Sequence, residues 1–69
     1  MSEEVRWAYD EPTGHFIGDA GLYEYWRVKE GEHAGKYAFQ RDGNTNIFYC
    51  DSAEEARADA NRLKKFSRL

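Results

Sequence analysis

The side chains that enzymes use most often for catalysis are few in this chain: two histidines and one cysteine. His15 and His33 stand in or beside glycine-rich turns, and Cys50 is followed directly by Asp51. A nucleophilic set of His33, Cys50 and Asp51 can be drawn, but nothing in the spacing brings these groups together. Two His and one Cys match no usual paired-ligand metal spacing, and no phosphate-binding glycine loop is present. The sequence therefore predicts no catalytic residues, no metal and no cofactor.

Acidic side chains are concentrated in the predicted turns. In an antiparallel meander, alternate turns lie at the same end of the sheet. We expect one end to carry Asp10, Glu11, Asp19 and Asp42. We expect the other end to carry Glu30, Glu32, Asp51, Glu54 and Glu55, where acids stabilise the start of a helix. The first group has no such local reason, so it predicts either solvated turns or carboxylates that mimic nucleic-acid phosphates on a basic partner surface.

Residues 22–30 form the longest strand candidate and carry large side chains on both faces. The side expected to face the helix carries Leu22, Trp26 and Val28. The outward side is expected to carry Tyr23, Tyr25, Arg27 and Lys29. Tyr and Arg are enriched at interface hot spots, whereas cross-strand tyrosines also stabilise sheets by themselves. The pattern thus leaves open a partner-binding face built on Tyr23, Tyr25 and Arg27, a homodimer seam, or simple shielding.

Other segments complete the predicted fold. Strands are indicated at 5–9, 36–41 and 46–50, with 15–17 an optional strand. Asp42-Gly43-Asn44 favours a tight hairpin turn. Ser52 followed by Glu55 is a capping box, and the alanine-rich stretch after it predicts a C-terminal helix. The fold class expected is α+β: an antiparallel meander of three to five strands with one helix packed across one face.

Composition limits the chain to one domain, residues 1–69. Its 11 aromatic residues can hold a small core together, since a lone cysteine forms no internal disulfide. No apolar stretch is long enough to cross a bilayer, and the acidic start lacks the features of a secretory signal. These features predict a cytoplasmic protein without a membrane segment.

Charge is distributed unevenly along the chain, whose formal net charge is −3. Residues 1–55 hold twelve acids and five bases, whereas residues 56–69 hold one acid and five bases. One side of the predicted helix collects Arg57, Asn61, Lys64, Lys65 and Arg68. This stripe is expected either to contact phosphates or to be an ordinary solvated helix face.

A strand passing through Asp51 and Ser52 into the capped helix at Ala53-Glu54-Glu55-Ala56 resembles the ends of several small families. Plant-type AP2 DNA-binding domains and the arm-binding domains of phage integrases are similar in this step. Those families read DNA with a basic sheet, whereas the sheet region here is net acidic. Small phage-encoded anti-CRISPR proteins are similar in size, acidity and layout, which implies an inhibitor acting in the host cytoplasm.

Three hypotheses on function follow. The first is a non-enzymatic inhibitor or regulator whose acidic turns dock on a basic surface of a protein partner, such as a nucleic-acid-binding complex. The second is a nucleic-acid-binding accessory domain that uses the basic helix and the Tyr23 and Tyr25 face, although the acidic body disfavours nucleic acid. The third is a structural homodimer joined along an edge strand or the aromatic face.

Overall fold

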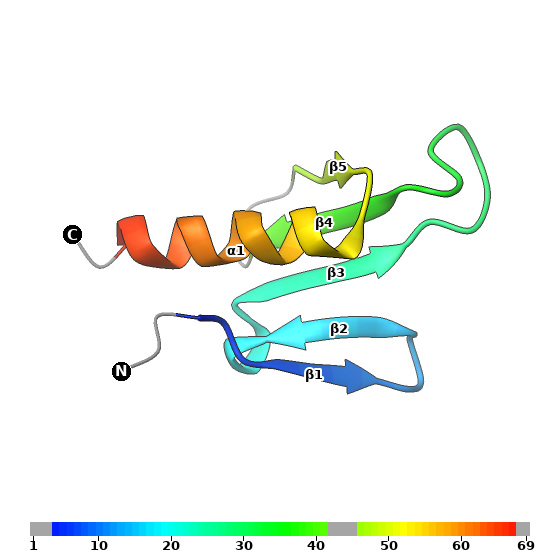
Figure 1. Ribbon diagram of the computed structural model, residues 1–69. Coiled ribbons are helices and arrows are strands. Elements are labelled where there is room, and N and C mark those ends of the chain that lie inside the picture. The colour runs from blue at the N-terminus through cyan, green and yellow to red at the C-terminus, as the bar shows by residue number, and fades with distance from the viewer. Residues whose placement is uncertain (1–3, 42–45, 68–69) are drawn as a thin grey trace.

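The computed structural model describes residues 4–41 and 46–67 as a five-stranded antiparallel sheet with one helix packed on it (Figure 1). The strands are β1 (Trp7–Asp10), β2 (His15–Gly18), β3 (Tyr23–Arg27), β4 (Tyr37–Arg41) and β5 (Phe48–Cys50), and they lie in the sheet in chain order. A short 3-10 turn, Asp19–Gly21, links β2 to β3, and α1 spans Ala53–Ser67. The predicted α+β meander is confirmed, and the optional strand at 15–17 does form.

One register row of the sheet is aromatic on every strand. Antiparallel pairing joins Tyr9 to Phe16, Phe16 to Tyr25, Tyr25 to Phe39 and Phe39 to Phe48. Directly opposed residues share a face of the sheet, so this aromatic row lies on one side throughout. Its centre is the core, with Tyr25 and Phe39 each 2% exposed, while Tyr9 and Phe48 at its two ends remain exposed.

Helix α1 packs over the middle of this aromatic row because the side chains on its inner side are small. Ala56 and Ala60 are 0% exposed, and these small side chains let α1 lie close to the sheet. The predicted N-cap is confirmed, because the Glu55 amide donates to Ser52 Oγ. The Glu55 carboxylate accepts from the Asp51 amide, one residue before the amide that a capping box uses. Within the described residues, no helix has the length and apolar character needed to cross a membrane.

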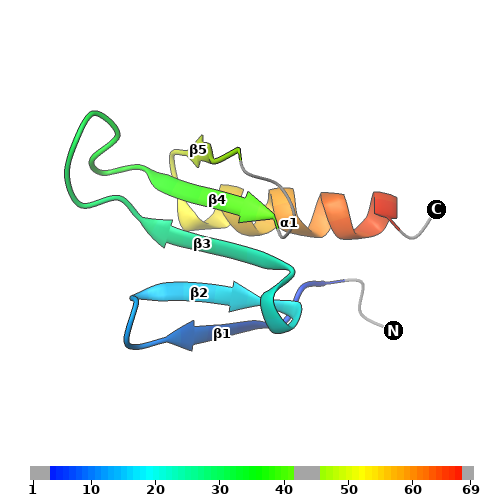
Figure 2. The ribbon, with the colours of Figure 1, turned by 180° about the vertical axis from the view of Figure 1, so that it is seen from behind.

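The two faces of β3 are reversed relative to the sequence prediction. Tyr23 and Tyr25 are buried on the face that α1 covers, whereas Trp26 is half-buried on the opposite, helix-free face. Figure 2 shows the sheet with this helix-free face toward the viewer. Leu22 is 51% exposed. The reason lies in the neighbouring strands: Tyr25 opposes Phe16 and Phe39, while Trp26 opposes Ala38, so the larger apolar row is the one with Tyr25. The prediction of an outward Tyr23 and Tyr25 surface is therefore wrong.

The hairpin between β4 and β5 is confirmed at the level of its strands, because these two pair in antiparallel register. The Asp42-Gly43-Asn44 turn itself lies outside the described residues.

The face reversal predicts different costs for two truncations. Tyr25→Ala should destabilise the chain by about 3–5 kcal/mol, since it removes a fully buried ring from the centre of the core. Trp26→Ala should cost clearly less, because the half-buried indole lies outside the helix-covered core. Urea unfolding of both variants measures the difference. Equal losses, or a larger loss for Trp26→Ala, would contradict the face assignment.

Candidate partner-binding surface

The turns divide the acidic residues between the two ends of the sheet differently from the prediction. Because β2 is a complete strand, the turn after Asp10 and the corner at Asp19 lie at opposite ends. The predicted grouping of Asp10 and Glu11 with Asp19 is therefore wrong. Asp42, the fourth member of that group, lies outside the described residues.

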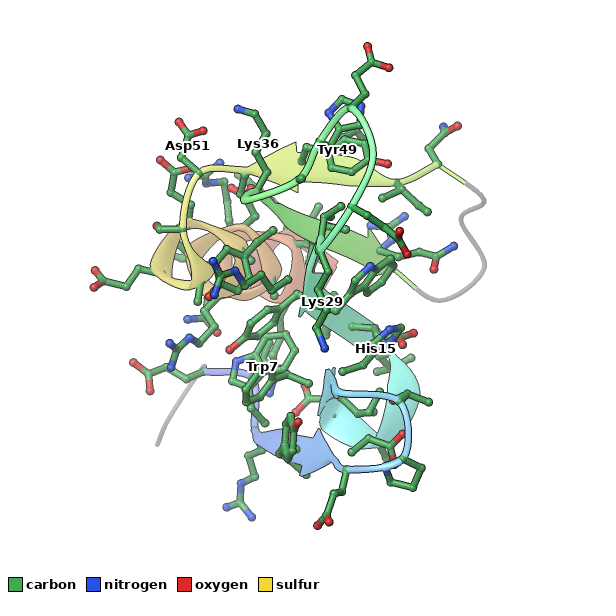
Figure 3. The ribbon with its side chains drawn as sticks, turned by 90° about the vertical axis from the view of Figure 1, so that its right-hand side faces the viewer. Trp7, His15, Lys29, Lys36, Tyr49 and Asp51 are labelled. Carbon is green, nitrogen blue, oxygen red and sulfur yellow. The ribbon has the colours of Figure 1, made fainter. Side chains whose placement is uncertain are left out.

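Asp10 and Glu11 instead share an end with the second predicted group. The β1–β2 turn, the β3–β4 loop and the start of α1 all lie at this end of the molecule, which faces the viewer in Figure 3. We call it the acidic end; the carboxylates of these three links are Asp10, Glu11, Glu30, Glu32, Asp51, Glu54 and Glu55. Arg27, a predicted partner-binding residue, lies there exposed, together with Lys29 and Lys36.

Only some of these carboxylates are engaged within the chain. Asp10 accepts a hydrogen bond from the Thr13 hydroxyl, and Asp51 pairs with Lys36 at 2.9 Å. That hydrogen bond and the charge of Asp51 raise the pKa of Lys36. Among the described residues, four exposed carboxylates of this end have no hydrogen-bond or ion-pair partner: Glu11, Glu30, Glu32 and Glu54.

Asp19, at the opposite end, is a structural residue. One carboxylate oxygen accepts a hydrogen bond from the Arg6 amide at 3.0 Å, and the other pairs with Lys64 of α1 at 2.9 Å. The hydrogen bond from the Arg6 backbone, followed by that from Lys64, lowers the pKa of Asp19. Its side chain is only 17% exposed, so it is not a free charge for docking.

The basic stripe of α1 makes further contacts beside the Asp19–Lys64 ion pair. Asn61 Oδ1 accepts a hydrogen bond from the Val5 amide at 2.7 Å, and Lys64 donates to the Glu4 carbonyl. The Arg57 guanidinium lies 5.9 Å from the centre of the Tyr25 ring. The Asn61 and Lys64 contacts attach the segment before β1 to the helix, whereas Arg57 contacts β3. Much of the stripe therefore serves the fold rather than an open phosphate-binding surface, and Arg68 lies outside the described residues.

The helix-free face carries two histidine–aromatic stacks that the sequence analysis missed. The His15 ring stacks on Trp26 with centroids 4.4 Å apart, and His33 stacks on Tyr49 at 3.8 Å. Ala38 lies between Trp26 and Tyr49 in the register and is 1% exposed. His15 also hydrogen-bonds to Glu24. The sequence does contain a signal for the two faces of the sheet. Along β4, the small or polar Ala38 and Gln40 alternate with the aromatic Tyr37 and Phe39.

The candidate nucleophile is not placed for catalysis. Cys50 is 7% exposed, and its thiol contacts the Asp59 carboxylate at 3.7 Å rather than a histidine. Burial, and then the charge of Asp59, raise the pKa of Cys50 to about 11, which disfavours the reactive thiolate. In the part of the chain that the structure describes, no three His, Cys, Asp or Glu side chains gather to hold a metal.

No family model, curated protein or solved structure matches this chain.

Removing the charge of Asp19 should weaken the joint between β1, the β2–β3 corner and α1. Asp19→Asn is expected to cost about 1–2 kcal/mol, since it converts a charged hydrogen-bond network to a neutral one. Folding lowers the Asp19 pKa, so its stabilisation is complete above 3.8 and is lost as the pH falls through the lower folded-state value. Thermal melts from pH 7 to pH 2 should therefore converge for the two proteins at the acid limit. Glu11→Gln is the matched control and should melt as wild type at pH 7; a gap that persists in acid would contradict the role of the Asp19 charge.

The raised pKa of Cys50 predicts slow alkylation. At pH 8, a shift from 9.0 to about 11 lowers the thiolate fraction about 100-fold. Iodoacetamide should therefore label the folded chain at least that much more slowly than the chain in denaturant. Asp59→Asn should speed labelling of the folded protein, because the Asp59 charge disfavours the thiolate. Equal rates in folded and unfolded protein would contradict this description of the thiol.

Proposed function

We propose that this chain is a non-enzymatic protein-binding inhibitor or regulator that docks its acidic end on a basic surface of a partner protein. The observation that carries the proposal is the convergence of exposed carboxylates from three separate links of the chain. The β1–β2 turn supplies Glu11, the β3–β4 loop supplies Glu30 and Glu32, and the start of α1 supplies Glu54. None of these four has a partner within the described residues.

Acidic residues outnumber basic ones at this end, where Arg27, Lys29 and Lys36 stand among seven carboxylates. The other described bases of the sheet flanks and of the last turns of α1, Arg6, Arg41, Lys64 and Lys65, lie toward the other end of a molecule whose long axis is 37 Å. At physiological ionic strength, exposed charges are screened over about 8 Å, so an approaching partner experiences mainly the charge of the end it meets. A basic groove of the kind that binds nucleic acid fits such an end, and acidic side chains would speed its association.

The proposal extends to the type of protein and to its compartment. An acidic docking surface on a small domain accords with the resemblance to phage-encoded anti-CRISPR inhibitors, which act on nucleic-acid-binding complexes. A lone cysteine held as a buried thiol suits a reducing compartment such as the host cytoplasm.

Charge reversal at the acidic end provides the test. The variant Glu11→Lys, Glu30→Lys, Glu32→Lys should fold normally, because these side chains are exposed and unpaired. Immobilised wild-type chain should capture proteins from a nuclease-treated bacterial lysate, and raising the salt to about 0.5 M should release them. The triple variant should lose this capture.

The matched control reverses two exposed charges at the opposite end, Arg41→Glu and Lys65→Glu, and should retain the captured proteins. Capture that survives the triple reversal would overturn the proposal. So would sub-micromolar binding to duplex DNA or RNA in a low-salt gel shift that the control variant abolishes, an outcome that would favour the nucleic-acid-binding hypothesis.

A further inference from the structure

The outer edge of β5, a strand of three residues, carries none of the charged or proline residues that often protect an edge strand. Three successive large apolar side chains are exposed on it: Ile47 is 40% exposed, Phe48 53% and Tyr49 43%. No strand of the described residues pairs with this edge, and the segment from Asn46 to Cys50 has no charge and no proline. Natural edge strands are commonly blunted by such residues because an open edge invites another strand to pair. At the other edge, β1 includes the charged Asp10, whereas the nearest acid to β5, Asp51, stands just after the strand.

An apolar groove runs beside the same strand. It has a volume of about 320 Å³ and lies between β5 and α1, with Phe39, Phe48 and Leu63 among its lining residues. Phe66 of α1 is 61% exposed. The spacing of Asp59, Arg62 and Phe66 places these residues on the side of the helix that borders the groove. Edge and groove together form one apolar surface.

The charged side chains on this side of α1 are complementary to the same side chains of a second chain related by a two-fold axis. Along α1 they run from acid to base, with Glu55 and Asp59 before Arg62. Within one chain Arg62 pairs with Asp59 at 3.2 Å, so a second copy would extend an existing ion pair into a network across the two-fold axis. Asp59 is level with Cys50, which it contacts, and Leu63 is level with Phe48. Antiparallel pairing of β5 with a second β5 about Tyr49 sets each Cys50 opposite the other copy's Phe48. Asp59 of one copy then lies beside Arg62 and Leu63 of the other.

The spacing between the two helices also suits this arrangement. Since α1 packs over β3, β4 and β5, its axis lies near β4. Two β4 strands joined through paired β5 strands are about 14 Å apart. Helices in direct contact are 8–10 Å apart, so large side chains are needed to fill the gap. Phe48, Leu63 and Phe66 of each copy are positioned to do so.

We propose that this chain forms a two-fold homodimer in which β5 pairs antiparallel with β5 of a second copy. The result is one continuous sheet with both helices on the same face and their apolar grooves closed against each other. The two acidic ends point in opposite directions, so dimerisation leaves Glu11, Glu30 and Glu32 open to other partners. The dimer does not depend on the proposed docking function.

Charge reversal across the two-fold axis tests the geometry. Wild type should sediment at twice the 8.1 kDa chain mass at tens of micromolar. Asp59→Arg and Arg62→Asp should each weaken self-association at least about 10-fold, because each places like charges opposite one another across the axis. Mixing the two single variants should restore a dimer, since a chain with arginine at both positions then faces a chain with aspartate at both. A change in the stability of one chain cannot produce that rescue.

The two ends of the aromatic row provide a matched pair of edge variants. Phe48→Lys places a charge in the β5 edge and should give a monomer, whereas Tyr9→Lys, at the β1 edge with 58% exposure, should leave the dimer intact. A wild-type chain that stays monomeric at about 100 µM would overturn the proposal and leave the β5 edge to a strand of a different protein. A dimer unaffected by both Phe48→Lys and the Asp59 and Arg62 reversals would also overturn it. If Phe48→Lys unfolds the chain, as circular dichroism would show, the mixing experiment decides.

Discussion

The packing of one helix on an aromatic row that crosses all five strands determines the rest of the structure. The chain has no disulfide, so its stability rests on the buried centre of that row, Tyr25 and Phe39. Five strands span about 19 Å, whereas an α-helix with its side chains is about 10–12 Å wide. One helix therefore cannot cover the whole row. Tyr9 and Phe48 are exposed at its ends because of this difference in width.

The two uncovered flanks are completed in different ways. On the β1 side, the segment before β1 lies against the helix: Val5 is buried and hydrogen-bonded to Asn61, and Lys64 reaches Asp19. Gly18 makes this possible, because a Cβ there would lie 2.5 Å from Val5 Cγ1. On the β5 side, no described segment plays this part. The apolar groove and the open strand edge are therefore on the same flank, and the proposed second copy would cover both.

Local features of the fold could be predicted from the sequence, and features that depend on neighbouring strands could not. Ser52 and Glu55 identified the helix start because a cap is decided within four residues. The faces of β3 were predicted wrongly because Trp26 and Tyr25 are both large, and only the residues opposite them decide which is buried. The ends assigned to Asp10 and Asp19 depended on whether β2 formed, since one extra strand moves every later turn to the other end.

The acidic end combines carboxylates with two different physical backgrounds. Asp51, Glu54 and Glu55 surround the first turn of α1, where the partial positive charge of the helix dipole and the Lys36 ion pair compensate them. Glu11, Glu30 and Glu32 belong to the β1–β2 turn and the β3–β4 loop, away from that helix end. They have no partner among the described residues, so gathering them at one end raises the free energy of the isolated chain slightly. A basic partner surface would remove that cost on binding. For this reason the proposed docking depends more on these three residues than on Glu54, whose charge the helix dipole already stabilises.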